Sequence, residues 1–510
     1  MDVFQSLGAG FLVALSPLNL LYCFIGVIAG TIIGALPGIG PSAGVAILLP
    51  ITFGVSPTTS MIMLAGIYYG AMYGGTITSV LINVPGESSS VMTTLDGYQM
   101  AKKGRAGAAL GIAAFGSFIA GTGSVIIFTF FAPWLAKVAL SFGPQEYFAL
   151  MVLGFTALAG LASESPVKTI ISAAIGLILA TIGLDSMSGH PRFTFGSSNL
   201  LGGFDFLPVA MGLFGVAEVL MSSESVARLE IQKADLTLKK VFPTAEDWVR
   251  SRWAIVRGWL LGFVVGVLPG AGATIASFLS YAAEKRASKH PEEFGQGAIE
   301  GVAGPESANN AASVGALVPL LTIGVPGSAT TAVMMGALMM YGLRPGPLLF
   351  TENPDFVWGL VASMYIGNVL LVILNMAFIP LFVRIVKIPQ WILNPLILIF
   401  CIVGVYALQN NLYDVWIMLA FGLVGYIMKK LSFPAAPLVL ALVLGDMMET
   451  NLRRSLILSH GSVTTFFTRP ISATIIVIAL LALVYPVLRW LLAKRRRASA
   501  PGSATGGATH

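Results

Sequence analysis

The sequence GTIIGALPGIGPSAG, residues 30–44, places a Pro-Gly pair in the middle of an apolar run. A second stretch, GFVVGVLPGAGATIA at residues 262–276, repeats this pattern at a constant offset of 232 positions (262 minus 30). Proline removes a backbone donor and glycine permits non-helical angles, so the pair ends a helix. Open backbone at membrane depth is tolerated only where protein buries it or where it lines a water-filled cavity. Each stretch therefore predicts the tip of a hairpin or of a broken helix.

The composition of the chain predicts a membrane protein. Charged residues make up 10% of its 510 residues and apolar residues 56%, whereas a soluble globular protein averages about 25% charged residues. The mean hydropathy is +0.85. Apolar runs of about 20 residues recur along the chain, and the alternating pattern of an outer-membrane barrel does not. These features exclude a soluble enzyme and a disordered or fibrous chain. They predict an all-α polytopic membrane protein with roughly 12 transmembrane crossings.

A second motif follows each Pro-Gly stretch in the same order. Residues 82–90 read INVPGESSS and residues 323–331 read IGVPGSATT, at an offset of 241 (323 minus 82). Two motifs in the same order in both halves indicate a gene duplication. The glycines four positions apart before the first break, Gly26, Gly30 and Gly34, are typical of close helix packing in lipid.

Charge placement predicts the orientation of the two copies. The Lys and Arg residues gather in short breaks between apolar runs, and the positive-inside rule places those breaks in the cytoplasm. The breaks lie at residues 102–105, 228–257, 285–289, 384–387, 429–430 and 489–497. Three segments poor in Lys and Arg are predicted outside, at residues 185–205, 352–355 and 410–414. The first copy then begins outside and the second inside. The chain is therefore predicted to contain two inverted-topology repeats, an architecture of many secondary transporters.

The predicted organisation follows from these breaks. Residues 1–222 form the first repeat half, 223–257 a cytoplasmic connecting loop, 258–460 the second half, 461–497 a C-terminal transmembrane helix with a basic end, and 498–510 a disordered tail. The N-terminus is predicted outside and the C-terminus inside. Predicted helices include residues 167–184, 357–383 and 434–444.

The breaks also predict a binding site. A helix N-terminus presents free N–H groups that suit a carboxylate, and helix C-termini present carbonyls that suit Na⁺. Ser42 and Thr274 follow the breaks at matching offsets, and we expect them to cap the second helix or to contact the ligand. The alternative is that the breaks are kinks that only permit packing. The residues predicted to bind substrate are Pro37, Gly38, Gly40, Ser42, Pro85, Gly86, Ser88, Pro269, Gly270, Gly272, Thr274, Pro326, Gly327 and Ser328.

A second candidate site lies in the stretch GVAGPESANNAA, residues 301–312. Glu306 shares one helical face with Asn309 or Asn310, because residues three or four apart are neighbours on a helix. An ionisable group near membrane depth is a functional hypothesis by default. The alternative is that Glu306 and Glu87 cap helix N-termini at the surface. The residues predicted to couple an ion are Glu306, Asn309, Asn310, Asn83 and Glu87.

Several kinds of chemistry have no sequence signal. The two cysteines, Cys23 and Cys401, lie in apolar runs and are interpreted as core residues. The four histidines form no metal-ligand spacing, and the sequence has no phosphate-binding loop, zinc-protease motif or nucleophile elbow. We therefore predict no enzyme activity, no resident metal or cofactor, and no ATP-driven transport.

Three stretches resemble one known family. The runs at residues 30–41, 84–90 (VPGESSS) and 304–311 (GPESANNA) are similar to the large membrane subunit of tripartite tricarboxylate transporters, the TctA family, and the resemblance covers about residues 1–495. It implies a bacterial inner-membrane secondary transporter that imports tricarboxylates or related carboxylates by alternating access. It implies coupling to a Na⁺ or H⁺ gradient and two partners, a small TctB-like membrane subunit and a periplasmic TctC-like solute-binding protein. The alternative is an uncoupled channel or permease for small organic anions.

Overall fold

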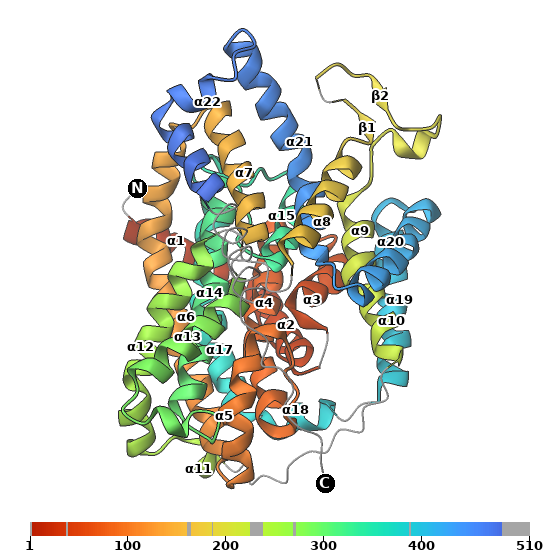
Figure 1. Ribbon diagram of the computed structural model, residues 1–510. Coiled ribbons are helices and arrows are strands. Elements are labelled where there is room, and N and C mark those ends of the chain that lie inside the picture. Colours follow the sequence, from red (N-terminus) through yellow and green to blue (C-terminus); the bar gives the residue numbers. More distant parts are fainter. Residues whose placement is uncertain are drawn as a thin grey trace, which may run out of the picture.

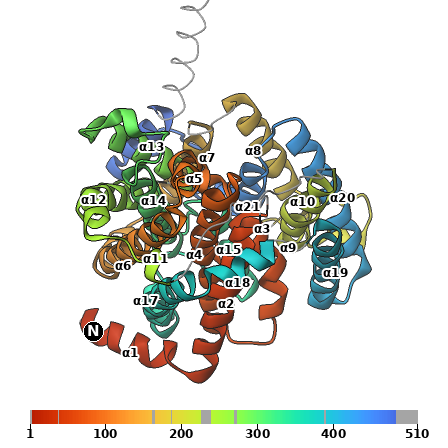
Figure 2. The same ribbon diagram turned by 90° about the horizontal axis from the view of Figure 1, so that it is seen from below.

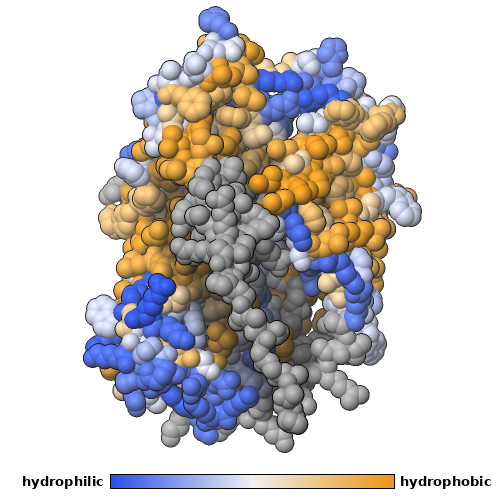
Figure 3. All heavy atoms as spheres, viewed as in Figure 1, coloured by the Kyte–Doolittle hydropathy of each residue, from blue (hydrophilic) through white to orange (hydrophobic). Residues whose placement is uncertain are grey.

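The computed structural model describes residues 3–36, 39–160, 165–185, 187–224, 238–268, 272–386 and 389–481. It is built almost entirely of helices, and an apolar band lies between hydrophilic ends on the face shown (Figures 1 and 3). Six helices of the described chain are long and apolar enough to cross a membrane, at Pro17–Ala35, Ala106–Ala139, Phe206–Glu224, Pro354–Ala377, Leu412–Lys430 and Ala435–Leu458. Shorter apolar helices accompany them. These features confirm the all-α multi-pass class, while the number of crossings stays a prediction.

The first part of the chain contains most of the elements that build the site. They are α1 (Val3–Ala14), α2 (Pro17–Ala35), α3 (Gly40–Leu48), η1 (Leu49–Thr52), α4 (Pro57–Ile82), η2 (Ser88–Ser90), α5 (Val91–Lys102), α6 (Ala106–Ala139), α7 (Pro144–Gly160), α8 (Pro166–Ala180), β1 (Gly183–Leu184), β2 (Pro191–Arg192), η3 (Ser198–Leu200), α9 (Phe206–Ala210), the π-helical turn η4 (Met211–Val216) and α10 (Ala217–Glu224). The two strands pair antiparallel as one short hairpin.

The second part repeats some of these elements. It contains α11 (Leu238–Val241), α12 (Ala245–Val267), α13 (Gly272–Ala287), η5 (Pro291–Glu293), α14 (Glu300–Ile323), α15 (Ala329–Met340), α16 (Leu349–Glu352), α17 (Pro354–Ala377), α18 (Ile379–Val386), α19 (Gln390–Gln409), α20 (Leu412–Lys430), α21 (Ala435–Leu458) and α22 (Thr465–Thr468). In both ribbon views α12 and α6 lie toward one side, and α10, α19 and α20 form the opposite side (Figures 1 and 2).

The core of the molecule is formed around α4 and α14. Nearly every residue of both helices is buried. A helix without a distinct polar face is expected in the centre of a bundle rather than at its surface. The helix α4 packs on α2, and α14 packs on α12, α6 and α13. Both long helices therefore contact several neighbours at once, which places their polar residues away from lipid.

Glycines set the contact between α2 and α4, and the same contact recurs between α12 and α14. A Cβ added at Gly30 would lie 2.4 Å from the carbonyl oxygen of Ile67, and one added at Gly262 would lie 2.2 Å from that of Ala308. The full series pairs Gly26, Gly30 and Gly34 with Met63, Ile67 and Ala71, and Gly258, Gly262 and Gly266 with Gly304, Ala308 and Ala312. The offsets between the two series are 232 and 241, the same as between the sequence motifs. Such close backbone approach requires the small residues noted in the sequence.

The same series of elements follows each glycine contact. The helix α4 ends at Asn83 with φ 58°, and α14 ends at Gly324 with φ 72°, both left-handed. A Val-Pro-Gly turn comes next, and a capping box then starts η2 at Glu87 and α15 at Ser328. The helix α5 lies at the lower end of Figure 1, whereas α15 lies in its upper half. The two sequence copies thus have the same order of elements, and their inverted orientation stays a prediction.

Two predicted boundaries are wrong because helices extend further than expected. The predicted connecting loop at residues 223–257 ends in helix, since α12 begins at Ala245 after a capping box between Thr244 and Asp247. The predicted helix at residues 434–444 continues to Leu458 as α21. In both places charged residues lie on a helix that extends beyond the apolar run, so hydropathy alone ended the element too early.

Two other predicted helices are too long. The run at residues 357–383 is two helices, α17 and α18, which part at Phe378. Pro380 follows this break and has no N–H to continue the helix. The run at residues 167–184 ends at Ala180, because Gly183 and Leu184 form a strand. Of the predicted C-terminal helix at residues 461–497, the structure describes residues 461–481, which contain α22 and a separate helix at Pro470–Leu481, and residues 482–510 lie outside the described chain.

Candidate functional site

The two Pro-Gly breaks lead into short helices with open N-termini. Gly40 begins α3 with φ +60°, and Gly272 begins α13 with φ +62°. A Cβ built at either glycine would meet no atom of the described residues within 4 Å. Left-handed backbone of this kind favours glycine. The predicted residues Pro37, Gly38, Pro269 and Gly270 lie outside the described chain.

The tip of the second half reaches the first half. The hydroxyl oxygens of Ser88 and Thr274 lie 2.8 Å apart. Ser88 starts η2 and is exposed, while Thr274 lies in the first turn of α13 and is half-buried. Thr274 thus meets a residue of the other half, whereas the N-cap of α3 is Ile39 and no side chain of the described residues caps this helix. The sequence predicted that Ser42 and Thr274 lie at helix starts. The contact between Ser88 and Thr274 is visible only in the fold.

Ser328 makes a second contact between the two halves. It caps α15 by accepting a hydrogen bond from the Thr331 N–H at 3.2 Å. Its hydroxyl also lies 3.1 Å from the hydroxyl of Tyr68 on α4. The N-terminus of α15 is therefore held against the central helix of the first half. Tyr68 is only 1% exposed, and nothing in the local sequence distinguishes it from a core tyrosine.

The Val-Pro-Gly turns have a packing role. A Cβ at Gly86 would lie 1.9 Å from the carbonyl oxygen of Gly34, and one at Gly327 would lie 2.9 Å from that of Gly266. Each glycine is buried, and each lets the turn pack against the helix that precedes the break. These turns position the serines that follow them. Pro326 is buried and Pro85 is half-buried at the same turns.

Glu306 lies deep within the helix bundle. It is fully buried on α14, where its carboxylate accepts hydrogen bonds from the hydroxyl of Thr93 on α5 and, at 3.1 Å, from the amide of Asn309. The amide of Asn310 donates to the Glu306 carbonyl oxygen at 3.1 Å and to the hydroxyl of Ser117 on α6 at 2.7 Å. The prediction that these three residues share a helix face is correct. The alternative of a surface cap is wrong for Glu306, because α14 begins six residues earlier, at Glu300.

Glu87 is both a cap and a buried acid. Its carboxylate accepts hydrogen bonds from the backbone N–H of Ser89 at 3.0 Å and from the hydroxyl of the same residue. Its side chain is nevertheless buried, with 6% of the residue exposed. Asn83, by contrast, is exposed at the left-handed end of α4. Glu87 therefore combines the capping role with the buried position expected of a functional acid.

The two acids lie beside the same turn of α4. A Cβ at Gly75 would lie 2.9 Å from Cγ of Glu87, and the hydroxyl of the next residue, Thr76, interacts with Glu306. In the described part of the chain, no Lys, Arg or His forms an ion pair with either carboxylate, and no cluster of His, Cys, Asp and Glu has the makings of a metal site. Burying an unpaired charge is costly. The arrangement is therefore suited to take up a proton or a small cation.

The sequence did not identify the polar residues that complete this site. Thr76, Thr93 and Ser117 come from α4, α5 and α6, and each is an ordinary small polar residue in a helical stretch. Only their contacts with Glu306 and Asn310 distinguish them from other buried hydroxyl groups. Contacts between helices cannot be predicted from the spacing of residues along one helix.

The helices and this buried acidic site define the chain as an all-α, multi-pass membrane protein whose polar interior joins two similarly built parts. A family model described as "Tripartite tricarboxylate transporter TctA family" matches residues 20–440. The chain belongs to this family. It is therefore a membrane subunit of a tripartite tricarboxylate transport system, a kind of transporter rather than an enzyme.

Two relatives come from Agrobacterium vitis. The chain is 48% identical over 498 residues to a protein called "Uncharacterized 52.8 kDa protein in TAR-I ttuC' 3'region", an alignment that covers 97% of this chain and 98% of that protein. It is 46% identical over 234 residues to "Uncharacterized protein in TAR-II ttuC' 3'region", which covers 46% of this chain and 97% of that protein. No solved structure matches the chain.

Proposed function

We propose that this chain is the translocation subunit of a secondary transporter that imports tricarboxylates or related carboxylates by alternating access. A Na⁺ or H⁺ gradient drives uptake, a periplasmic solute-binding protein delivers the substrate, and a small membrane subunit completes the complex. The chain lies in a bacterial inner membrane with its N-terminus in the periplasm and its C-terminus in the cytoplasm. The family and the placement of basic residues support this assignment.

One observation carries the proposal of coupling. Glu87 and Glu306 are both buried beside the same turn of α4, and their partners among the described residues are all neutral. Glu87 directly precedes Ser88, which meets Thr274 at the open tip of the second half. A substrate carboxylate at this tip would lie in the field of Glu87. Two like charges about 6 Å apart repel by about 3 kcal/mol at an effective dielectric constant of about 20.

This repulsion supplies a coupling mechanism. When a cation or proton neutralises the acids, the anion binds at the N-terminal turn of α13, beside Ser88 and Thr274, because a helix N-terminus favours negative charge. When the acids keep their charge, the repulsion of about 3 kcal/mol lowers the affinity for the anion about 100-fold. Inverted repeats of similar construction then allow the site to open to either side in turn.

Uptake measurements test the proposal. The full chain would be co-expressed with its two partners, and uptake of labelled carboxylates would be measured with and without imposed Na⁺ and pH gradients. We expect Glu306→Gln and Glu87→Gln each to abolish the ion dependence of uptake at normal membrane levels. Glu292→Gln serves as the control, because the side chain of Glu292 is 69% exposed. Full-rate, ion-dependent uptake by both buried variants would contradict the assignment.

The alternative, an uncoupled channel or permease, makes a different prediction. Uptake would then persist after both ion gradients are collapsed and would follow only the substrate gradient. The buried acids would have no role in such a protein, so their neutralisation would leave the rate unchanged. The unpaired burial of Glu87 and Glu306 favours the coupled transporter.

A further inference from the structure

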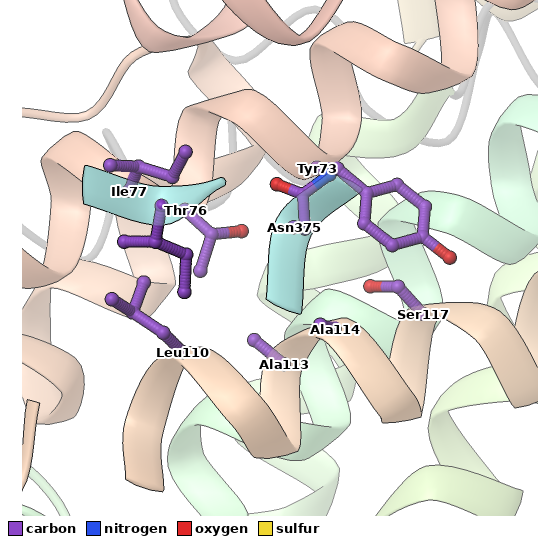
Figure 4. Close-up of a pocket in the computed structure, with 9 residues that line it drawn as sticks. Tyr73, Thr76, Ile77, Leu110, Ala113, Ala114, Ser117 and Asn375 are labelled. Carbon is purple, nitrogen blue, oxygen red and sulfur yellow. The ribbon is translucent and has the colours of Figure 1, made fainter. Parts of the chain in front are cut away.

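A small cavity lies between the helices next to Glu306. It is lined by side chains from α4, α6, α17 and α18, which are Tyr73, Thr76, Ile77, Leu110, Ala113, Ala114, Ser117, Asn375 and Ile379 (Figure 4). The volume of the cavity is about 10 Å³. This is room for about one water molecule.

The cavity has an unsatisfied polar group in its wall. The hydroxyl of Tyr73 is buried and has no hydrogen-bond partner among the residues that the structure describes, and the residue is 3% exposed. Thr76, Ser117 and Asn375 add further oxygen atoms to the lining. A water or ion bound beside it is one way to satisfy a buried polar atom of this kind. A site with two to four polar groups and room for one water is the kind that holds such an occupant.

The cavity is connected to Glu306 through two of its lining residues. Thr76 interacts with the Glu306 carboxylate. Ser117 donates a hydrogen bond to the Glu306 carbonyl oxygen at 3.2 Å and accepts one from Asn310. A cation or proton that leaves the carboxylate therefore has hydroxyl oxygens to move to on the cavity side.

The cavity also lies close to the basic ends of two helices. Leu110 and Ala113 belong to the first two turns of α6, which directly follows Lys102, Lys103 and Arg105. Asn375 lies in the last turn of α17, and α18 follows with Arg384. The positive-inside rule places both of these ends at the cytoplasmic face.

We propose that this cavity is the station through which the coupling cation passes between Glu306 and the cytoplasm, along the oxygens of Tyr73, Thr76, Ser117 and Asn375. The occupant is a small oxygen-bound cation, either Na⁺ or a proton carried by a water molecule. This inference rests on the proposed function and adds to it a release route with named residues.

Silver-ion accessibility tests the cavity without any substrate. Ag⁺ is a small monovalent cation that reacts with thiols, and Cys23 and Cys401 are buried, so the unsubstituted chain gives the background. Ala113→Cys and Ala114→Cys would be compared with Ala109→Cys in inside-out vesicles that contain the full chain in nitrate salts. Ala109 is equally buried on the same helix but does not line the cavity. Remaining thiols would be counted with a maleimide after denaturation.

The expected result is reaction at positions 113 and 114 at least about tenfold faster than at position 109, because thiol reactivity follows access. Slower reaction in sodium nitrate than in choline nitrate would identify Na⁺ as the occupant. Equal rates in the two salts would identify a water that carries the proton. Rates at 113 and 114 no faster than at 109 would overturn the proposal.

A second comparison tests the unsatisfied hydroxyl. Tyr73→Phe should slow ion-dependent uptake about fivefold, the factor that one net hydrogen bond is worth. Tyr69→Phe is the matched control, because Tyr69 is also buried on α4 but does not line the cavity. Equal uptake by the two variants would overturn the role of Tyr73.

The two proposals fail in different ways. If uptake depends on an ion gradient and on Glu306 but silver does not reach positions 113 and 114, the release route is wrong and the transporter assignment stands. If silver reaches these positions but uptake ignores both gradients, the route exists as a hydrated path and the proposed coupling is wrong.

Discussion

The hydroxyl of Ser88 lies 2.8 Å from the hydroxyl of Thr274, although the two residues are 186 positions apart. This pair joins the start of η2 in the first half to the start of α13 in the second half. A symmetric protein that opens to alternate sides must rearrange contacts between its halves. The Ser88–Thr274 pair is a contact between the halves, and both of its residues belong to the predicted anion site.

Removing one hydroxyl of this pair should weaken transport. Thr274→Val keeps the shape of the side chain and removes its hydrogen bond, so we expect a loss of about 1 kcal/mol, or about fivefold in uptake efficiency. The measurement is the concentration dependence of uptake in the assembled complex. Thr351→Val, at an exposed position on α16, is the control. Unchanged uptake by Thr274→Val would show that the pair only fills space.

Adding a methyl group at the glycine contacts should destabilise the bundle. Gly30→Ala and Gly262→Ala would each force a Cβ against a backbone carbonyl oxygen, at 2.4 and 2.2 Å. Overpacking of this kind costs about 1–3 kcal/mol. The thermal midpoint in detergent should fall for both variants. Gly8→Ala, which would meet no atom within 4 Å, should leave it unchanged. An unchanged midpoint for both packed variants would contradict the close contact.

A buried aspartate should hold the loop before α14. Asp96 on α5 accepts hydrogen bonds of 2.8 Å from the backbone N–H groups of Gly295, Gly297 and Ala298, and one of 2.8 Å from the Tyr281 hydroxyl. Asp96→Asn turns one acceptor into a donor. Hydrogen bonds to charged groups contribute about 1.5–3 kcal/mol each, so the loop should loosen.

Hydrogen exchange of residues 295–298 measures this effect. We expect faster exchange in Asp96→Asn than in the unsubstituted chain. Asp355→Asn is the control, since Asp355 is exposed at the start of α17. Equal exchange in the Asp96 and Asp355 variants would show that the loop is held by other contacts.

The stability of the β1–β2 hairpin should depend on pH through Asp185. The Arg453 guanidinium donates to both carboxylate oxygens, at 3.0 and 2.8 Å, and with the Met187 N–H it holds the pKa of Asp185 well below its ordinary value. A lowered pKa in the folded state means that the contact stabilises the hairpin above about pH 3.9, the ordinary pKa of an aspartate. This stabilisation is lost as the pH falls below that value towards the folded-state pKa.

Exchange protection of the hairpin tests this sign. After correction for intrinsic rates, protection of residues 183–192 should be constant from pH 7 to about pH 5 and should decrease below about pH 4. Arg453→Gln should show reduced protection already at pH 7. Constant protection down to pH 3 would contradict the role of the ion pair.

Much of the fold was predictable from local patterns. Apolar runs predicted helices because the bilayer sets their length, and the Pro-Gly pairs predicted breaks because they remove the backbone bond that continues a helix. The errors occur where charged residues extend a helix, as in α12 and α21, or where a proline divides one, as at Phe378. Hydropathy responds to side-chain polarity, whereas helix ends are set by capping and backbone bonding.

Part of the candidate site was also predictable. Glu306, Asn309 and Asn310 were found because helical spacing places them on one face, and Glu87 because it follows a break. Their depth was not predictable, since burial depends on the helices that pack around them. The structure shows that Glu306 is fully buried and that Glu87 is a buried cap.

The sequence by itself determined the membrane class, the duplicated motifs and the identity of the acidic residues, because these depend on composition and on spacing along one helix. Only the tertiary structure decided which helices meet. In the folded chain Thr93 contacts Glu306 and Ser117 contacts Asn310. Ser88 contacts Thr274, and Tyr73 lines a cavity. The physical reason is that such contacts join residues distant in sequence, and only the packing of α4, α5, α6 and α14 against one another sets their distances.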